Sequence, residues 1–112
     1  MEEKLSVEEE LGLDANALAI TRAILFDRRY DSIKEEGDRI YSEVLEVLEK
    51  HIGDCSIGGF MYAMAKTVAT VAMSASKSSQ NVPNPLVVVR AICYLAEVFS
   101  LFGDFRTRKV KK

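Results

Sequence analysis

The chain has 112 residues, a length that suits one domain, with a formal net charge of −2, 48% hydrophobic and 29% charged residues. Glycine and proline are few and β-branched residues do not alternate, so the pattern favours an all-α fold over a sheet protein. One histidine and two cysteines 38 residues apart exclude the spacing of a structural zinc site. They predict reduced thiols in a cytoplasmic protein.

The charge is unevenly distributed along the chain. Residues 1–54 hold 15 acids and 7 bases, whereas residues 55–112 hold 8 bases and 2 acids. The two halves could attract each other within one fold or across a dimer. We favour the simpler interpretation that helices and a tail differ in sign, because exposed charge pairs contribute little free energy. The acidic first ten residues are the reverse of a secretory signal.

The N-terminal segment, residues 1–13, is an acidic lead-in. Ser6 and Glu9 have the spacing of a capping box, and Gly12 could end a short extra helix of one or two turns. The segment could equally be disordered, as chain ends often are. Asp14 is the next good N-cap, and it precedes the alanine- and leucine-rich stretch Ala15 to Phe26, which has high helix propensity.

Residues 14–51 form either one long helix or two. Apolar residues keep a 4-3 spacing from Phe26 to His51, which fits a continuous helix. The polar run at residues 27–32 and a capping box at Ser32 and Glu35 favour a break near Asp31 instead. Beyond the break the pattern is amphipathic and ends at Gly53, and we expect its apolar face to point inward: Ile40, Tyr41, Val44, Val47 and Leu48.

The stretch from Cys55 to Gly103 contains only four charged residues among 49. A loop at residues 76–85 divides it into two helices. The first is capped by Asp54 or Ser56 and carries an apolar seam with 4-3 spacing: Ile57, Met61, Met64, Val68, Val71 and Ala75. The second begins at the Asn84 cap with Pro85 in the first turn, and we expect Gly103 to end it in the left-handed conformation.

This last helix is apolar over most of its circumference, which is typical of a core helix, an oligomer interface or a membrane span. Arg90 and Glu97 argue against a membrane span, because charges near the bilayer centre are costly. These two charges are either partly exposed on a polar strip or paired across a helix or subunit interface. We expect an oligomer interface on this helix, formed by Val88, Ile92, Leu95, Phe99 and Phe102 with Arg90 and Glu97.

The candidates for chemistry are few. His51 lies at a helix end, where the C-terminal dipole favours it, which points to a structural role. Glu43, Glu46 and Glu49 recur every three residues, but a carboxylate metal site would need acids on the following helix, which has none. We therefore assign no catalytic residue, metal or cofactor.

The C-terminal residues 106–112 form a basic tail that could contact phosphates through Arg106, Arg108, Lys109, Lys111 and Lys112. Taken together, residues 1–112 predict a single all-α domain, a four-helix antiparallel bundle that forms a homodimer or a larger assembly. The predicted function is a non-catalytic module for protein–protein interaction or oligomerisation, as a self-associating protein or a small subunit of a larger complex. The alternative is a nucleic-acid-associated accessory subunit that binds through the basic tail.

Overall fold

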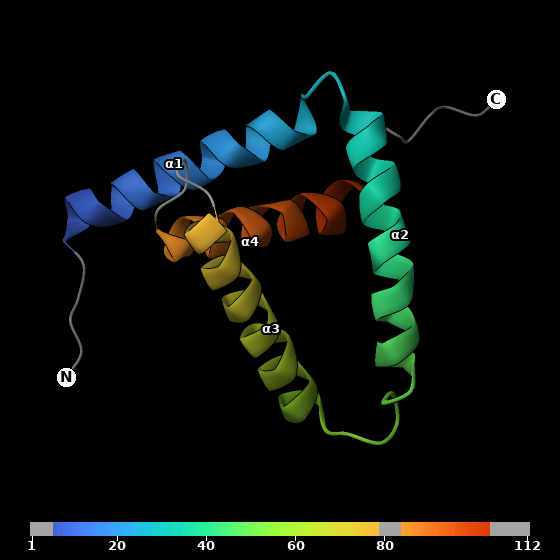
Figure 1. Cartoon of the computed structure of the whole chain (residues 1–112). Coiled ribbons are helices and arrows are strands. Elements are labelled where there is room, and N and C mark those ends of the chain that lie inside the picture. The colour runs from blue at the N-terminus through green and yellow to red at the C-terminus, as the bar shows by residue number, and fades with distance from the viewer. Residues whose placement is uncertain (1–5, 79–83, 104–112) are drawn as a thin grey trace.

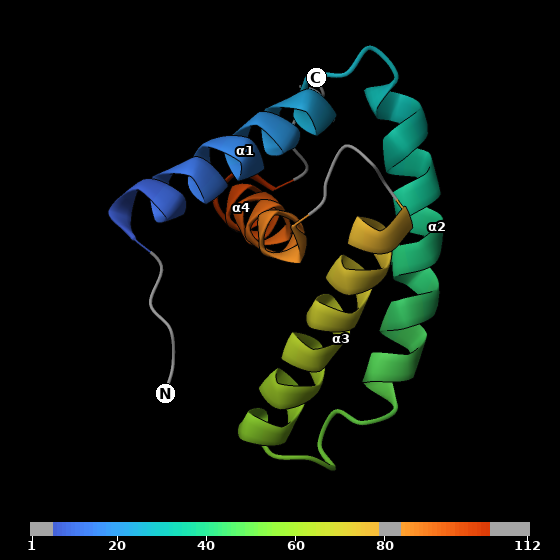
Figure 2. The same ribbon diagram turned by 60° about the vertical axis from the view of Figure 1, so that its left-hand side comes forward.

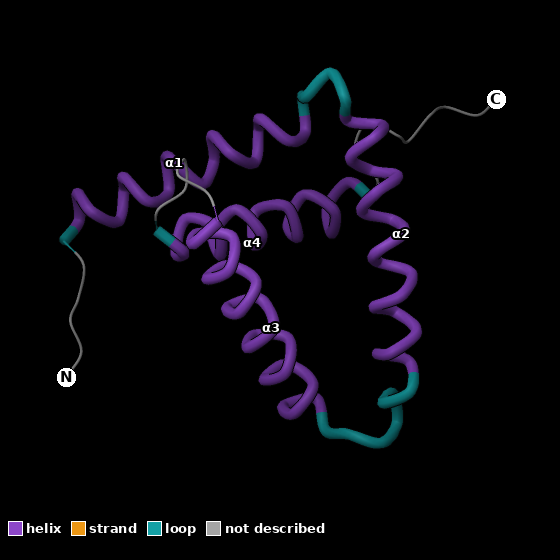
Figure 3. The backbone as a smooth tube through the Cα atoms, viewed as in Figure 1, coloured by secondary structure: helices purple, strands orange, loops and turns teal. Residues whose placement is uncertain are grey.

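The computed structural model describes residues 6–78 and 84–103, and within these ranges the chain forms four α-helices. They are α1 (Val7–Leu25), α2 (Tyr30–Glu49), α3 (Ile57–Ser78) and α4 (Pro85–Phe102), as Figures 1 and 3 show. The all-α prediction is confirmed for this part of the chain.

Helix α1 begins at the capping box that the sequence predicts. The Glu9 backbone N–H donates to Ser6 Oγ at 3.0 Å, and the Ser6 N–H donates to Glu9 Oε1 at 2.9 Å. The helix then continues through Gly12 and Asp14, so the predicted stop and the predicted second cap are both wrong. The alanine-rich run that follows stabilises a continuous helix, and Asp14 uses its carboxylate for a tertiary contact instead of a cap.

The chain breaks between α1 and α2, which confirms two helices over residues 14–51. The break lies at residues 26–29, before the predicted position. Asp27 Oδ1 accepts the Arg29 backbone N–H at 2.6 Å and pairs with Arg29 Nε at 3.2 Å. This side-chain turn competes with the helical hydrogen bonds and stops α1. The predicted cap at Ser32 and Glu35 is wrong, because both residues lie inside α2.

Helices α3 and α4 begin at predicted residues and α4 ends at the predicted Gly103, whereas α3 continues to Ser78, into the residues predicted as a loop. The Gly59 N–H donates to Ser56 Oγ, and the Leu86 N–H donates to Asn84 Oδ1 at 2.9 Å, with Pro85 in the first turn of α4. Gly53, after α2, and Gly103, after α4, both have positive φ, which glycine adopts without steric cost. The ψ of Gly103 is −145°, so it ends α4 outside the predicted left-handed helical conformation.

Helix α4 lies between α1 and α3 and contacts both. Its contact with α1 holds the core cluster of Ala17, Val87 and Ala91, whose side chains are almost completely buried, and α3 contributes the buried Ala72. In Figure 1, α1 and α4 both run from left to right, whereas α2 descends and α3 returns to the start of α4. The packing order is therefore α1, α4, α3, with α2 at the side.

Helix α2 approaches the backbone of α1 but not that of α3 or α4. Figure 2 shows α2 as an outer arm joined to α3 by the loop at the foot of the molecule. The molecule is consequently open: its radius of gyration is 16.0 Å, against ~13 Å for a compact domain of this length.

The start of α4 provides a stability test. Replacing Asn84 with Ala removes the acceptor for the Leu86 N–H and should lower the free energy of unfolding by about 1 kcal/mol. Urea denaturation at a fixed protein concentration measures the loss. Asn84→Ser, which keeps a capping oxygen, is the matched control and should retain most of the stability; equal losses in both variants would contradict the capping role.

Candidate interaction surfaces

A polar cluster joins α1 to α4 beside the core. Arg90 Nη1 lies 3.0 Å from Asp14 Oδ1 and 3.5 Å from the Glu10 carbonyl oxygen, and the Tyr94 hydroxyl donates to the same Asp14 oxygen at 3.1 Å. The charge of Arg90 is thus paired across a helix interface within one chain, which was one of the two alternatives for this residue. Glu97, two turns further along α4, is exposed.

The cluster shifts the titration of Tyr94. Desolvation of the half-buried phenol raises its pKa above the usual value, and the hydrogen bond to the carboxylate of Asp14 raises this pKa further. The neutral phenol is the form that donates to Asp14, so the contact between α1 and α4 favours the protonated state.

The residues predicted to form an oligomer interface on α4 occupy different environments. Val88, Ile92 and Leu95 are half-buried within the chain, whereas Phe99 and Phe102 near the end of the helix are exposed. The buried positions of α4, Val87 and Ala91, do not belong to the predicted interface and contact α1. The end of α4 is therefore the part of the predicted interface that stays accessible.

The apolar face of α2 is largely uncovered. Ile40, Tyr41, Val44 and Val47, called here the α2 stripe, are 58%, 58%, 43% and 53% exposed. The prediction that these residues point into a core is wrong for the single chain, because no described helix packs along them; Leu48 beside them is half-buried. An apolar row of this length on an otherwise charged helix is typical of a surface that another protein covers.

Helix α3 carries a second apolar row, which its own chain covers only in part. The row, called here the α3 stripe, belongs to the predicted seam: Ile57, Met61, Met64, Val68 and Val71. Ile57, Met61 and Val71 are 76%, 62% and 51% exposed, whereas Met64 and Val68 are half-buried. The last part of α3, where Ala72 is buried, meets α4, and the first half of the helix projects from the molecule (Figure 1).

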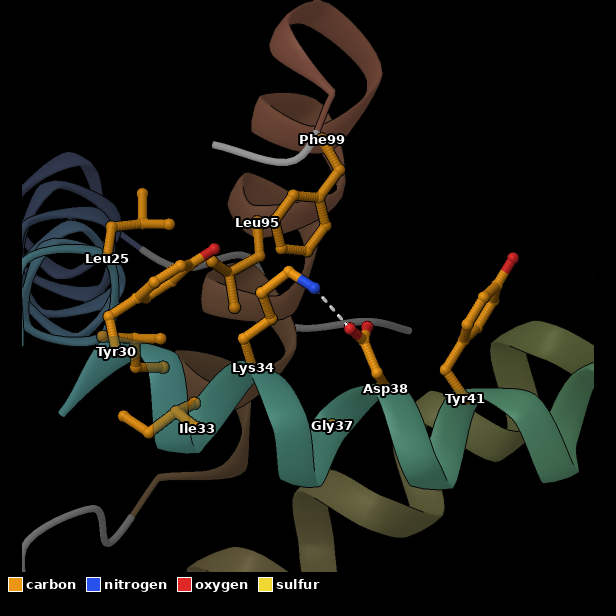
Figure 4. Close-up of a pocket in the computed structure, with 10 residues that line it drawn as sticks. Leu25, Tyr30, Ile33, Lys34, Gly37, Asp38, Tyr41, Leu95 and Phe99 are labelled. Carbon is orange, nitrogen blue, oxygen red and sulfur yellow. Dashed lines mark hydrogen bonds and ion pairs between the residues drawn. The ribbon is translucent and has the colours of Figure 1, made fainter. Parts of the chain in front are cut away.

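A cleft of about 600 Å³ separates the start of α2 from the end of α4. Figure 4 shows Leu95 and Phe99 of α4 facing α2 across the cleft. On the α2 side, the Lys34 amine donates to the Asp38 carboxylate. The lining is mainly apolar: Ile24, Leu25, Tyr30, Ile33, Lys34, Gly37, Asp38, Tyr41, Leu95 and Phe99. Sequence reasoning did not identify this cleft, because its two sides come from helices far apart in the chain.

The other predicted positions do not converge on a site. His51 is exposed, and so are Glu43, Glu46 and Glu49 of α2. Cys55 lies beside His51, and its thiol donates to the His51 carbonyl oxygen at 3.4 Å. Over residues 6–78 and 84–103, no group of three or more His, Cys, Asp or Glu side chains could hold a metal ion. The predicted phosphate contacts of the basic tail, Arg106 to Lys112, lie outside the described residues.

Helix α4 is the one described helix long and apolar enough to cross a membrane, with a mean hydropathy of 1.8. Length and composition alone are weak evidence, because the core helix of a globular domain has the same properties. Here α4 contacts helices on two sides and its Arg90 is paired with Asp14.

Comparisons with known proteins found no relative. No family model matches the chain, no curated protein is similar to it, and no solved structure matches its fold. The functional argument therefore rests on the residues and geometry above.

The raised pKa of Tyr94 predicts a pH dependence of stability. Because the folded-state pKa lies above the usual value near 10, the contribution of Tyr94 is complete below pH ~10 and is lost as the pH rises through the folded-state pKa. Tyr94→Phe should remove this part of the loss of stability at alkaline pH, as measured by urea denaturation at several pH values. A profile that Tyr94→Phe does not alter would contradict the assignment.

Proposed function

We propose that this protein is a non-catalytic helical module for protein–protein interaction, and that its first partner is a second copy of itself. The observation that carries the proposal is the exposure of the α2 stripe, of three α3 stripe residues and of two residues at the end of α4: Ile57, Met61, Val71, Phe99 and Phe102. Isolated apolar side chains on a surface need no explanation, but rows that follow the helical repeat on two helices do.

Association would also supply the predicted arrangement that the chain lacks by itself. In one chain, α1, α4 and α3 pack in succession, α2 stands apart, and the neighbours α1 and α4 run in the same direction, so one chain does not form an antiparallel four-helix bundle. The oppositely directed α2 and α3 of two copies would form such a bundle between the chains. We place the protein in the cytoplasm as a homodimer, either alone or as a small subunit of a larger complex.

The alternative, an accessory subunit that binds nucleic acid through Arg106 to Lys112, stays a prediction from sequence, since these residues lie outside the described ranges. In the described part, Arg29 is paired with Asp27, and Lys66 lies over the ring of Tyr62 at 5.6 Å from its centroid. Neither arrangement favours phosphate binding over an ordinary surface role.

Light scattering on a sizing column tests the proposed function. We expect a stable species of twice 12.5 kDa at both low and high salt, because apolar burial is screened little by ions. A monodisperse monomer across the concentration range would contradict self-association. A monomer that aggregates unless detergent or lipid is added would indicate that a membrane covers the exposed apolar residues. That result would also contradict self-association as the proposed function.

A further inference from the structure

We propose that two copies associate through a reciprocal contact in which the α2 stripe of each chain packs on the α3 stripe of the other. This proposal rests on the proposed function, since it requires self-association, and it adds the surface and the pairing. The partner is a second copy related by a two-fold axis, so each α2–α3 contact occurs twice.

The first argument is the position of the two stripes. Helices α2 and α3 are consecutive and joined by the loop at residues 50–56, yet their backbones do not pack against each other. Figures 1 and 2 show the pair as two arms that extend from the α1–α4 layer and meet only at this loop. Each arm presents its exposed apolar residues without a described helix to cover them.

The second argument is helix length. The arms have 20 and 22 residues, which corresponds to about 30 Å each at the rise of an α-helix. Helices of nearly equal length can pack along almost their whole extent. Because α2 descends and α3 ascends in Figure 1, two such hairpins can interlock with their helices alternating in direction. The result is a four-helix layer shared by both chains.

The third argument is charge, and it argues against one of the possible pairings. Helix α2 carries seven acids and two bases, a net charge of −5, whereas α3 carries no acid. Packing α2 against α2 of the partner would place two strongly negative helices side by side. Packing α2 against the partner's α3 avoids this repulsion, and avoided repulsion of this kind selects between alternative arrangements. Lys66 and Lys77 of α3 lie on the side opposite the α3 stripe and take no part in the contact.

The number of exposed apolar side chains suits the core of an interface. The two stripes contain nine apolar side chains in each chain, of which seven are exposed and Met64 and Val68 are half-buried. A two-fold contact would bring fourteen exposed and four half-buried side chains together.

Disulfide cross-linking between full-length chains tests the pairing. Both native cysteines are free and exposed, so Cys55→Ser and Cys93→Ser give a background without thiols. One chain then receives Val44→Cys on α2. A second chain with a mass tag receives Met61→Cys, Met64→Cys or Val68→Cys on α3. Three α3 positions are needed because a disulfide forms only over a narrow range of Cβ separations.

We expect the mixed α2–α3 pair to form a linked dimer under mild oxidation for at least one α3 position. The product should be lost when Glu46→Cys replaces Val44→Cys, because Glu46 lies on the opposite, charged side of α2 and controls for random collision. Circular dichroism of each reduced variant verifies that its helices are intact, as expected for changes at exposed or half-buried positions.

The possible failures are distinguishable. A linked dimer of Val44→Cys alone, without the mixed product, would establish an α2–α2 contact and overturn the reciprocal pairing. A mass of two chains by light scattering without any linked product would also overturn the pairing and would leave the proposed function intact. A mass of one chain would overturn both.

Discussion

The close contact between α1 and α4 is the constraint on which the rest of the structure depends. It is made by small side chains, Ala17 and Ala91, with Val87 beside them, so the two helix backbones can lie near each other. Thr21 extends this contact, because its hydroxyl donates to the Ala17 carbonyl oxygen at 2.8 Å and lies 3.5 Å from that of Ala91. Helix α3 is held through α4, and α2 through α1, so both arms depend on this pair.

Local signals in the sequence predicted where α1, α3 and α4 begin and where α4 ends. Caps such as Ser6 and Asn84 act through hydrogen bonds to residues two or three positions away, so their chemistry is readable without a fold. Asp14 has the same cap chemistry but lies inside α1, where Arg90 and Tyr94 take its carboxylate. Asp14 is 76 positions from Arg90 and 80 positions from Tyr94 in the sequence, so no local pattern distinguishes this interaction from a cap.

The pairing of apolar faces was much harder to predict than their existence. The periodicity of α2 and α3 correctly located the apolar rows, since a helical repeat follows from the sequence alone. It did not determine what covers each row, and the α2 stripe expected inside a core is exposed. The cleft between α2 and α4 was missed for the same reason. An amphipathic pattern requires a cover for its apolar face but contains no information on whether the cover belongs to the same chain.

The sparse attachment of α2 has a consequence for the energetics of local opening. A helix that contacts its own chain mainly near one end forms a separate unit of stability, and it can open at a lower free-energy cost than the α1–α4 pair. If a second copy covers α2, the cost of opening includes the cost of dissociation. It then rises by about 1.4 kcal/mol for each tenfold increase in free protein above the dissociation constant. The fraction of molecules in which α2 is open would thus fall as the concentration of the protein rises.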